Sequence, residues 1–590
     1  MLGSMRLPRP RAISFAPFRE EIRGYNFPTF RDDAMAALAI ALLTIPQSIA
    51  YSLLAGLPPT AGLFSAIFGT IFTAAFGSSR QLVSGPSTGV AILIQTSIAD
   101  VLYNYFETVT GPAKDALVMN LLMQIVLIMG IIQIASAFFN VGKVLQFVSR
   151  PVLLGYFAGI TVAIAVAQFF YFFGVPSLQS DDPILFRAWY FIAHLMEINI
   201  AALLIGCASL VVLLFFRRKL KNWPDALFAI VVGVLLTNAF QIWNFGPKVA
   251  TLGDLNLNAQ LIPELTFPFI DLKIINKIFP AAVAISFLAI LEVFSISRNF
   301  ASRSGQQVQV NQDVFGVGVG NLALSVISGS MPCSGSATRT ALNFRMNGKT
   351  RLAPIFSGIL TAIIIYFCWP FVQKIPLAAL AAILIATVPT LTNLQEVKLS
   401  FRATREDAWV FLLTFVSCLI FNLDVAFFIG IAISIATYLK KSSEPHLVEY
   451  AFNSKGRLMV INPKQDVHRK IRIIGIGGEL YFAAADFIQN AMTSVSDDPN
   501  VEAIVLRLNN VHHMDASMCL AIIRIHETLK AQKRYLLISG LTEEVWHVFH
   551  RAGLVKQLGL DNLYFTDESN PQFSTWKACL RAQELIHKKG

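Results

Sequence analysis

Apolar stretches of about the length needed to cross a membrane recur along this sequence up to residue 441, with short polar breaks between them. A helix needs about 20 mainly apolar residues to span the hydrocarbon core of a bilayer. Most of the apolar stretches are near this length, and they are 33–55, 60–77, 86–99, 116–139, 152–173, 198–216, 225–243, 278–297, 312–329, 335–346, 352–372, 376–391, 407–421 and 424–440. The sequence therefore predicts an α-helical polytopic membrane protein with fourteen transmembrane segments and a long loop at 244–275.

The distribution of charge divides the chain into two parts. Charged residues make up 14% of the 590 residues, against about 25% in ordinary soluble domains. Residues 1–441 hold 30 Lys/Arg and 20 Asp/Glu, whereas 442–590 hold 17 and 16, so the second part has the denser charge. Because the excess of positive charge lies in the first part, a basic nucleic-acid-binding tail is not expected. We expect an N-terminal segment at 1–30, a transmembrane domain at 31–441, a soluble domain at 445–570 and a tail at 571–590.

The loops between the predicted segments carry positive charge unevenly. If the N-terminus lies inside, the inner loops contain 15 Lys/Arg and the outer loops contain 6. Positive charge marks the cytoplasmic side of membrane proteins. Both termini and the soluble domain are therefore expected in the cytoplasm, with the transmembrane domain in the cell membrane.

Two segments do not read as ordinary spans. Residues 84–89 (SGPSTG) and 329–340 (GSMPCSGSATRT) are rich in Gly, Pro, Ser and Thr, and each precedes a short apolar run. They are the third and tenth segments, so each is third in a set of seven. Interrupted segments at matching positions of two halves indicate an inverted-repeat transporter and its binding site. The free N–H groups at half-helix N-termini favour an anion. The alternative is that both are helix-packing motifs, because small residues are common where helices meet in lipid.

Three polar side chains within the predicted spans are candidates for the transport chemistry. Arg339 lies in the tenth segment, and its guanidinium is a permanently charged fork suited to an oxyanion. Glu292 lies inside the eighth span, where it could pair with Arg339, carry a proton or help to hold sodium. Gln47 follows Pro46 in the first span, and its amide could donate to a substrate oxygen. The alternatives are an Arg339 that reaches the membrane interface, a permanent Glu292–Arg339 pair and a Gln47 that only bridges helices.

Other polar groups are expected to be structural. Asp33, Asp313 and Asp424 lie near span ends, where they are expected to cap helices or face the interface. The six cysteines form no CxxC pair and have no histidine at metal-ligand spacing, so neither a disulfide framework nor a metal site is expected. The sequence contains no evident nucleophile–base pair, so we expect neither an enzyme nor a cofactor.

The C-terminal part alternates between short strands and helices. Residues 471–476, 503–508 and 535–539 are expected to be buried strands, and 485–496, 516–532 and 542–552 are expected to be helices. This alternation predicts an α/β sandwich.

Several ordered motifs resemble the SulP anion transporters, the sulfate permease family, with a C-terminal STAS domain. The motifs in the membrane part are IPQSIAY at 45–51, AGLPP at 55–59, GSSRQ at 77–81 and TRTALN at 338–343. Those in the soluble part are GELYF at 478–482 and MDAS at 514–517. The resemblance covers about residues 20–570. It implies two inverted seven-segment repeats, divided into a gate domain and a core domain, followed by a cytoplasmic α/β STAS domain.

The resemblance also implies a site and a mechanism. The anion would lie between the third and tenth segments, lined by Gln47, Ser87, Ser336, Thr338 and Arg339. Glu292 matches the acidic residue that proton symporters of the family carry in the eighth segment. We therefore expect a secondary active transporter, with proton-coupled symport of sulfate or a similar inorganic anion or carboxylate, working as a homodimer. The alternatives are an uncoupled exchanger or channel and a sodium-coupled bicarbonate transporter.

Overall fold

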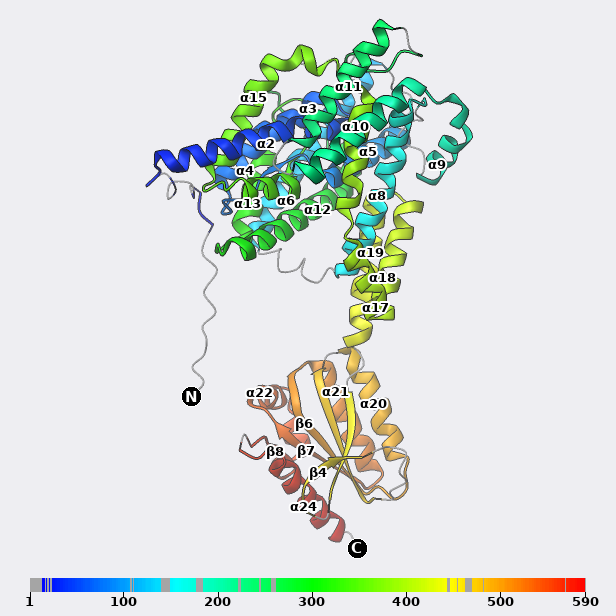
Figure 1. Ribbon diagram of the computed structural model, residues 1–590. Coiled ribbons are helices and arrows are strands. Elements are labelled where there is room, and N and C mark those ends of the chain that lie inside the picture. The colour runs from blue at the N-terminus through cyan, green and yellow to red at the C-terminus, as the bar shows by residue number, and fades with distance from the viewer. Residues whose placement is uncertain are drawn as a thin grey trace. The chain divides into compact units, whose positions relative to one another are not determined.

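The computed structural model divides the chain into two compact units, Met1–Ser434 and Ile435–Gly590. It describes residues 13–588 except 16, 18–20, 22, 23, 107, 108, 110, 140–148, 177–183, 221–223, 244, 245, 256–261, 443–445, 454, 462–468, 481 and 568. The first unit is helical and the second contains a six-stranded sheet (Figure 1).

The first unit confirms the predicted order of fourteen segments in two sets of seven. The first set is α2 (Phe27–Leu54), the second segment made of α3 (Pro59–Phe64), η1 (Ser65–Gly69) and α4 (Thr70–Phe76), then α5 (Thr88–Tyr105), α6 (Pro112–Phe138), α8 (Arg150–Phe173), α10 (Ile200–Lys219) and α11 (Asp225–Ile242). The second set is α12 (Leu272–Ser304), α13 (Val310–Ser325), α14 (Ala337–Arg345), α15 (Leu352–Val372), α16 (Leu377–Leu391), α18 (Arg405–Ile420) and α19 (Leu423–Ser442). The tenth segment, α14, is short as expected, with 9 residues, whereas α5 of the third segment continues for 18 residues, beyond the short apolar run that the sequence predicted.

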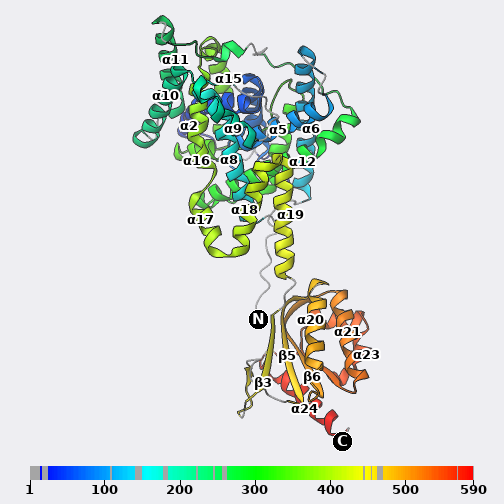
Figure 2. The same ribbon diagram turned by 90° about the vertical axis from the view of Figure 1, so that its right-hand side faces the viewer.

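The helices of this unit pack into two groups. The core helices are α2 to α6 and α12 to α15, which contact mainly one another. The gate helices are α8, α10, α11, α16, α18 and α19, which also pack together; Gly430 of α19 faces Val152 of α8 and Thr414 of α18. Helix α2 touches α11 and α16, and α5 touches α8, so the two groups meet along these helices. Figure 2 shows α10 and α11 on the opposite side of the unit from α6 and α12.

Among the described residues of the first unit, two α-helices lie outside the predicted spans. Helix α9 (Ile184–Ala193) follows α8, and α17 (Leu394–Ala403) lies between α16 and α18. Both have only 10 residues, so neither is long enough to cross a bilayer. In the long loop, Thr251 bridges to Pro376 and Leu265 bridges to Ile327.

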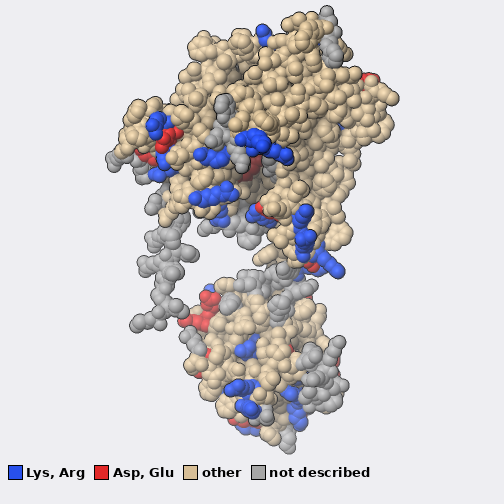
Figure 3. All heavy atoms as spheres, viewed as in Figure 1, with Lys and Arg blue, Asp and Glu red and all other residues tan. Residues whose placement is uncertain are grey.

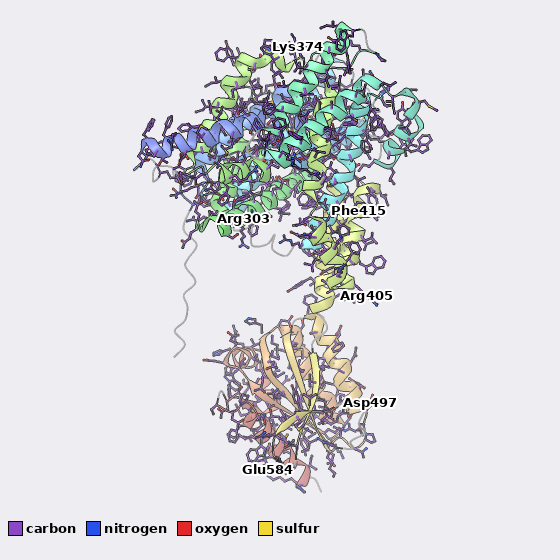
Figure 4. The ribbon with its side chains drawn as sticks, in the orientation of Figure 1. Arg303, Lys374, Arg405, Phe415, Asp497 and Glu584 are labelled. Atoms are coloured by element: carbon purple, nitrogen blue, oxygen red, sulfur yellow. The ribbon has the colours of Figure 1, made fainter. Side chains whose placement is uncertain are left out.

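Basic side chains gather at one end of the first unit. In Figure 3, Lys and Arg lie mostly over the lower part of this unit, while the upper part is largely uncharged. In Figure 4, Arg303 and Arg405 lie at that lower end and Lys374 lies at the opposite end. This matches the loop assignment from the sequence, in which Arg303 and Arg405 are inner residues and Lys374 is an outer one.

The second unit is an α/β fold around one mixed sheet. Its strands are β3 (His446–Phe452), β4 (Leu458–Val460), β5 (Ile471–Leu480), β6 (Ala503–Met514), β7 (Tyr535–Leu541) and β8 (Leu563–Phe565), in the order β4-β3-β5-β6-β7-β8. Strands β5 to β8 are parallel, and β3 is antiparallel to both of its neighbours. The sequence anticipated β5, β6 and β7 because they are continuous apolar runs, as strands covered on both faces are.

Helices cover both faces of this sheet. Helices α20 (Phe482–Ser496), α21 (Ala516–Ala531), α22 (Glu543–Arg551) and α23 (Leu554–Leu558) bury their apolar residues on one face, and Figure 2 shows α20, α21 and α23 along it. Helix α24 (Phe573–His587) packs Ala578 and Ala582 against the other face. Most of the segment expected as a tail at 571–590 is therefore a helix that covers the sheet.

Candidate functional site

The third and tenth segments begin side by side. Strand β1 (Ser84–Gly85) precedes α5, and β2 (Ser334–Gly335) precedes α14. The two strands pair antiparallel, with Ser84 opposite Gly335 and Gly85 opposite Ser334. Because each helix starts within three residues of its strand, both helix N-termini lie next to the strand pair. Their unpaired N–H groups and positive dipole ends make this place favourable for negative charge.

Two further hydrogen bonds, both to Val83, hold the segments next to the strand pair together. The Ser336 N–H donates to the Val83 carbonyl at 3.0 Å, and the Val83 N–H donates to the Thr340 hydroxyl at 3.1 Å. Gly85 has a φ of +142°, which side-chain-bearing residues rarely adopt. A Cβ at Gly85 would also lie 2.5 Å from Nη1 of Arg339. Glycine is therefore required here for both its backbone and its small size.

Arg339 is fully buried beside the strand pair, at 0% exposure. Its Nη2 donates to the Pro86 carbonyl at 2.6 Å, while Nε and Nη1 have no hydrogen-bond partner. Among the residues that the structure describes, no carboxylate lies within 4.0 Å of this guanidinium. The arginine thus presents two unsatisfied donors and an unbalanced positive charge inside a membrane segment, an arrangement that is costly without a negative partner.

Glu292 lies on α12, beside the strand pair that precedes α5 and α14. Its Oε2 accepts a hydrogen bond of 2.5 Å from the Ser334 hydroxyl. A Cβ at Gly89, in the first turn of α5, would lie 3.2 Å from Oε1. Glu292 and Arg339 form no ion pair within 4.0 Å in this structure. The carboxyl group therefore touches both half-helix starts but does not neutralise the arginine.

Helix α2 supplies the other wall of this region. Gln47 is buried, with 4% exposure, and its Oε1 has no hydrogen-bond partner. Tyr51 follows one turn later on the same face and is also buried, and α2 contacts α5. Helix α2 also contacts α14. Tyr51 was not among the residues expected from the sequence, although its four-residue spacing from Gln47 could have indicated it.

The three hydroxyl residues expected at the site lie at the helix starts. Ser87 caps α5 by accepting from the Val90 N–H at 3.3 Å. Ser336 is the residue before α14, and its Oγ lies 3.4 Å from Oγ1 of Thr338. The structure therefore gathers Ser87, Ser336, Thr338 and Arg339 around the strand pair.

The buried aspartates are satisfied by backbone and hydroxyl donors. Asp33 accepts from the Lys349 and Thr350 N–H groups at 2.7 and 3.1 Å. Asp313 accepts from the Ser78 and Ser79 N–H groups at 2.7 and 2.9 Å. These carboxylates hold loops in place, whereas the guanidinium of Arg339 keeps two donors free.

Comparison with known proteins identifies the family. Residues 30–414 match the sulfate permease family, and residues 456–568 match the STAS domain. The chain belongs to the sulfate permease family. It is thus a multi-pass membrane protein and an anion transporter, not an enzyme.

Relatives and solved structures agree with this assignment. The chain is 27% identical to "Probable sulfate transporter 4.2" of Arabidopsis thaliana, over 90% of this chain and 79% of the relative. It is 25% identical to "Sulfate transporter 4.1, chloroplastic" of the same plant, over 91% and 79%. Its fold is similar to that of the murine Solute Carrier 26 family member A9 anion transporter in the inward-facing state, with a TM-score of 0.85 and 19% identity over 98% of this chain and 97% of that one.

Proposed function

We propose that this member of the sulfate permease family is a secondary active transporter that carries sulfate, or an anion of similar charge, together with protons. The observation that carries the proposal is Arg339, a fully buried cation with two free donors and no carboxylate nearby among the described residues. An anion held at the two half-helix starts would satisfy these donors and balance the charge.

The proposed binding site consists of five side chains. In this proposal Arg339 provides the charge, the Gln47 amide donates from α2, and Ser87, Ser336 and Thr338 contribute hydroxyl groups at the helix starts. A tetrahedral oxyanion has several acceptor oxygens, which suits a guanidinium fork flanked by hydroxyl and N–H donors. Two relatives bear names as sulfate transporters, which supports sulfate as the first anion to test.

Glu292 is the proposed proton carrier. With sulfate bound and Glu292 ionised, three negative charges would face the single positive charge of Arg339. Protonation of Glu292 leaves two, so the loaded site becomes less costly to hold within the membrane. A proton taken up with the anion would thereby favour the loaded carrier, which is the differential stability that coupling requires.

Transport itself is proposed to occur by alternating access. The core helices hold both half-helices, Glu292 and Arg339, while the gate helices hold none of these groups. Movement of the core past the gate would carry the anion site from one side of the membrane to the other.

We also propose that the protein lies in the cell membrane with both termini in the cytoplasm, because the loop charges in the sequence favour this orientation. Protease protection of the STAS domain in sealed vesicles would check the orientation. Homodimerisation is a prediction from the family resemblance that native mass spectrometry would check.

The test is uptake of radiolabelled sulfate into proteoliposomes with and without an inward proton gradient. Unlabelled bicarbonate, chloride and fumarate serve as competitors, and a sodium gradient replaces the proton gradient in a parallel arm. Uptake stimulated by the proton gradient is the expected result. Sulfate exchange at the same rate with and without the proton gradient contradicts proton coupling. Uptake driven only by the sodium gradient would instead show coupling to sodium. A competitor that is carried in place of sulfate contradicts the substrate.

A further inference from the structure

A single buried amide holds the chain where it enters the tenth segment. Asn321 lies on α13 and is fully buried, at 0% exposure. Its Oδ1 accepts from the Cys333 N–H at 2.8 Å, and its Nδ2 donates to the Cys333 carbonyl at 3.0 Å. The same Nδ2 donates to Oε1 of Gln133 on α6 at 2.8 Å. One side chain therefore satisfies both polar groups of a residue that has left helical structure inside the membrane.

The held residue directly precedes every group that forms the second half of the site. After Cys333 come Ser334, whose hydroxyl donates to Glu292, and Gly335, which pairs with Ser84. Helix α14 then begins and places Arg339 in its first turn. Because a trans peptide leaves only two soft dihedral angles per residue, fixing both the N–H and the carbonyl of Cys333 sets the direction in which this strand leaves.

The first half of the molecule has a corresponding contact. Thr70, at the start of α4 in the second segment, donates to the Ser84 carbonyl at 2.5 Å. Asn321 occupies the ninth segment, so in each repeat the segment before the half-helix holds the strand that leads into it. The two contacts differ in strength of restraint, because Thr70 fixes one backbone group and Asn321 fixes two.

We propose that Asn321, supported by Gln133, is a positioning residue for the anion site. It acts on bound anion through the backbone of Cys333, by setting where Ser334, Gly335 and the start of α14 lie. The inference rests on the proposed anion site, because its effect is expected in anion affinity. An apolar residue at this position would leave the Cys333 N–H and carbonyl without partners at membrane depth, where no water replaces them.

The test compares Asn321→Ser with a matched control in the full-length protein. Ser325→Ala removes a buried hydroxyl from the same helix, but this hydroxyl bonds only to the Leu322 carbonyl of that helix, at 2.8 Å. Radiolabelled sulfate uptake in proteoliposomes gives KM and the maximal rate, and thermal unfolding gives Tm. Asn321→Ser should raise KM on the order of tenfold, the size of coupling seen between residues in one hydrogen-bond network. Ser325→Ala should leave KM within about twofold.

The outcomes separate a positioning role from a purely structural one. Asn321→Ser with unchanged KM and a lower maximal rate would mean fewer folded carriers, and would overturn the inference. If Asn321→Ser yields no folded protein, Gln133→Met decides instead, because it removes only the support of the Asn321 amide; a KM increase smaller than tenfold is expected, and no increase overturns the proposal.

Arg339→Ala distinguishes failure of this inference from failure of the proposed site. An Arg339→Ala carrier with normal KM contradicts the anion site itself. A raised KM in Arg339→Ala, together with normal KM in Asn321→Ser, contradicts only the positioning role.

Discussion

The core helices and the gate helices differ in how deeply they bury charged side chains. In the core, Asp33, Asp313 and Arg339 are all fully buried. In the gate, Arg217 pairs with Asp225 at 3.0 Å near the ends of α10 and α11, and both side chains keep some exposure. Buried charge is expensive in a membrane, so the core must contain either partners for it or a reason to keep it.

The comparison within the core isolates one group. Asp33 and Asp313 each accept hydrogen bonds from two backbone N–H groups. Arg339 satisfies one nitrogen only and has no ion-pair partner within 4.0 Å among the described residues. Burial of a charge alone therefore does not indicate a transport site, whereas a buried charge with unused hydrogen-bond donors does.

The largest expected effect comes from preventing the core from moving past the gate. Asn422, between α18 and α19, donates to Asp100 of α5 at 2.9 Å, so these side chains join the two groups. We would place cysteines at both positions in a background without native cysteines and bridge them with a short, cleavable thiol cross-linker. The bridge should abolish sulfate uptake, and cleavage of the cross-linker should restore it. Thr161 and Thr392 lie 3.0 Å apart within the gate group, so the same bridge there should leave uptake intact. Equal uptake in both bridged proteins would contradict motion of the core against the gate.

Arg339→Ala is expected to have the next largest effect. Hydrogen bonds to a charged group contribute about 1.5–3 kcal/mol each, so sulfate affinity should fall roughly tenfold to a hundredfold or more. Equilibrium binding of radiolabelled sulfate to purified protein measures this. Arg217→Ala in the gate is the control, because its charge is already paired with Asp225, and it should change affinity much less.

One glycine of the core and one of the gate lie where an added methyl group would be too close to a neighbouring side chain. Gly85→Ala would place a methyl group 2.5 Å from Nη1 of Arg339, at a φ of +142°. Gly206→Ala, in the gate, would place one 3.0 Å from the ring of Phe172. Both should lower Tm, by overpacking that typically costs about 1–3 kcal/mol. Only Gly85→Ala should also weaken sulfate binding. Equal weakening by Gly206→Ala would contradict the assignment of the anion site to the core helices.

The smallest effect concerns pH. In the long loop between α11 and α12, hydrogen bonds from Lys248 and Thr251 lower the pKa of Asp254 to about 2. A carboxyl group with a lowered pKa stabilises the fold above its ordinary pKa of 3.8, and this stabilisation is lost as pH falls from there toward 2. Asp254 therefore stays ionised from pH 5 to 8, and Asp254→Asn should leave the pH profile of sulfate uptake unchanged. A shifted profile in Asp254→Asn would show that uptake responds to carboxylates outside the core.

The sequence predicted the continuous spans well because length and hydropathy alone determine what can cross a bilayer. It also located both interrupted segments, since Gly and Pro exclude regular helix there. The pairing of β1 with β2 could not be predicted, because strands of two residues carry no periodicity. Helices α9 and α17 were missed because they are too short to give a span signal.

The sequence named candidate residues for the site but could not predict the contacts that they make. Arg339 and Glu292 stand out as charges within apolar runs, yet their sequence positions leave open whether they pair. Contacts between positions far apart in the chain decide this: Ser334 lies against Glu292, and Pro86 lies against Arg339. Asn321 gave no signal of its own, because a lone asparagine in an apolar helix is equally compatible with a helix–helix contact.

In the proposed mechanism Arg339 binds the anion and Glu292 carries the proton, and one variant separates these two roles. Purified Glu292→Gln in proteoliposomes should lose sulfate accumulation driven by an inward proton gradient, because an amide cannot take up the proton. It should retain exchange of internal for external radiolabelled sulfate in the absence of any gradient, because Arg339 is unchanged. Gradient-driven accumulation equal to that of the unmodified protein would contradict the account.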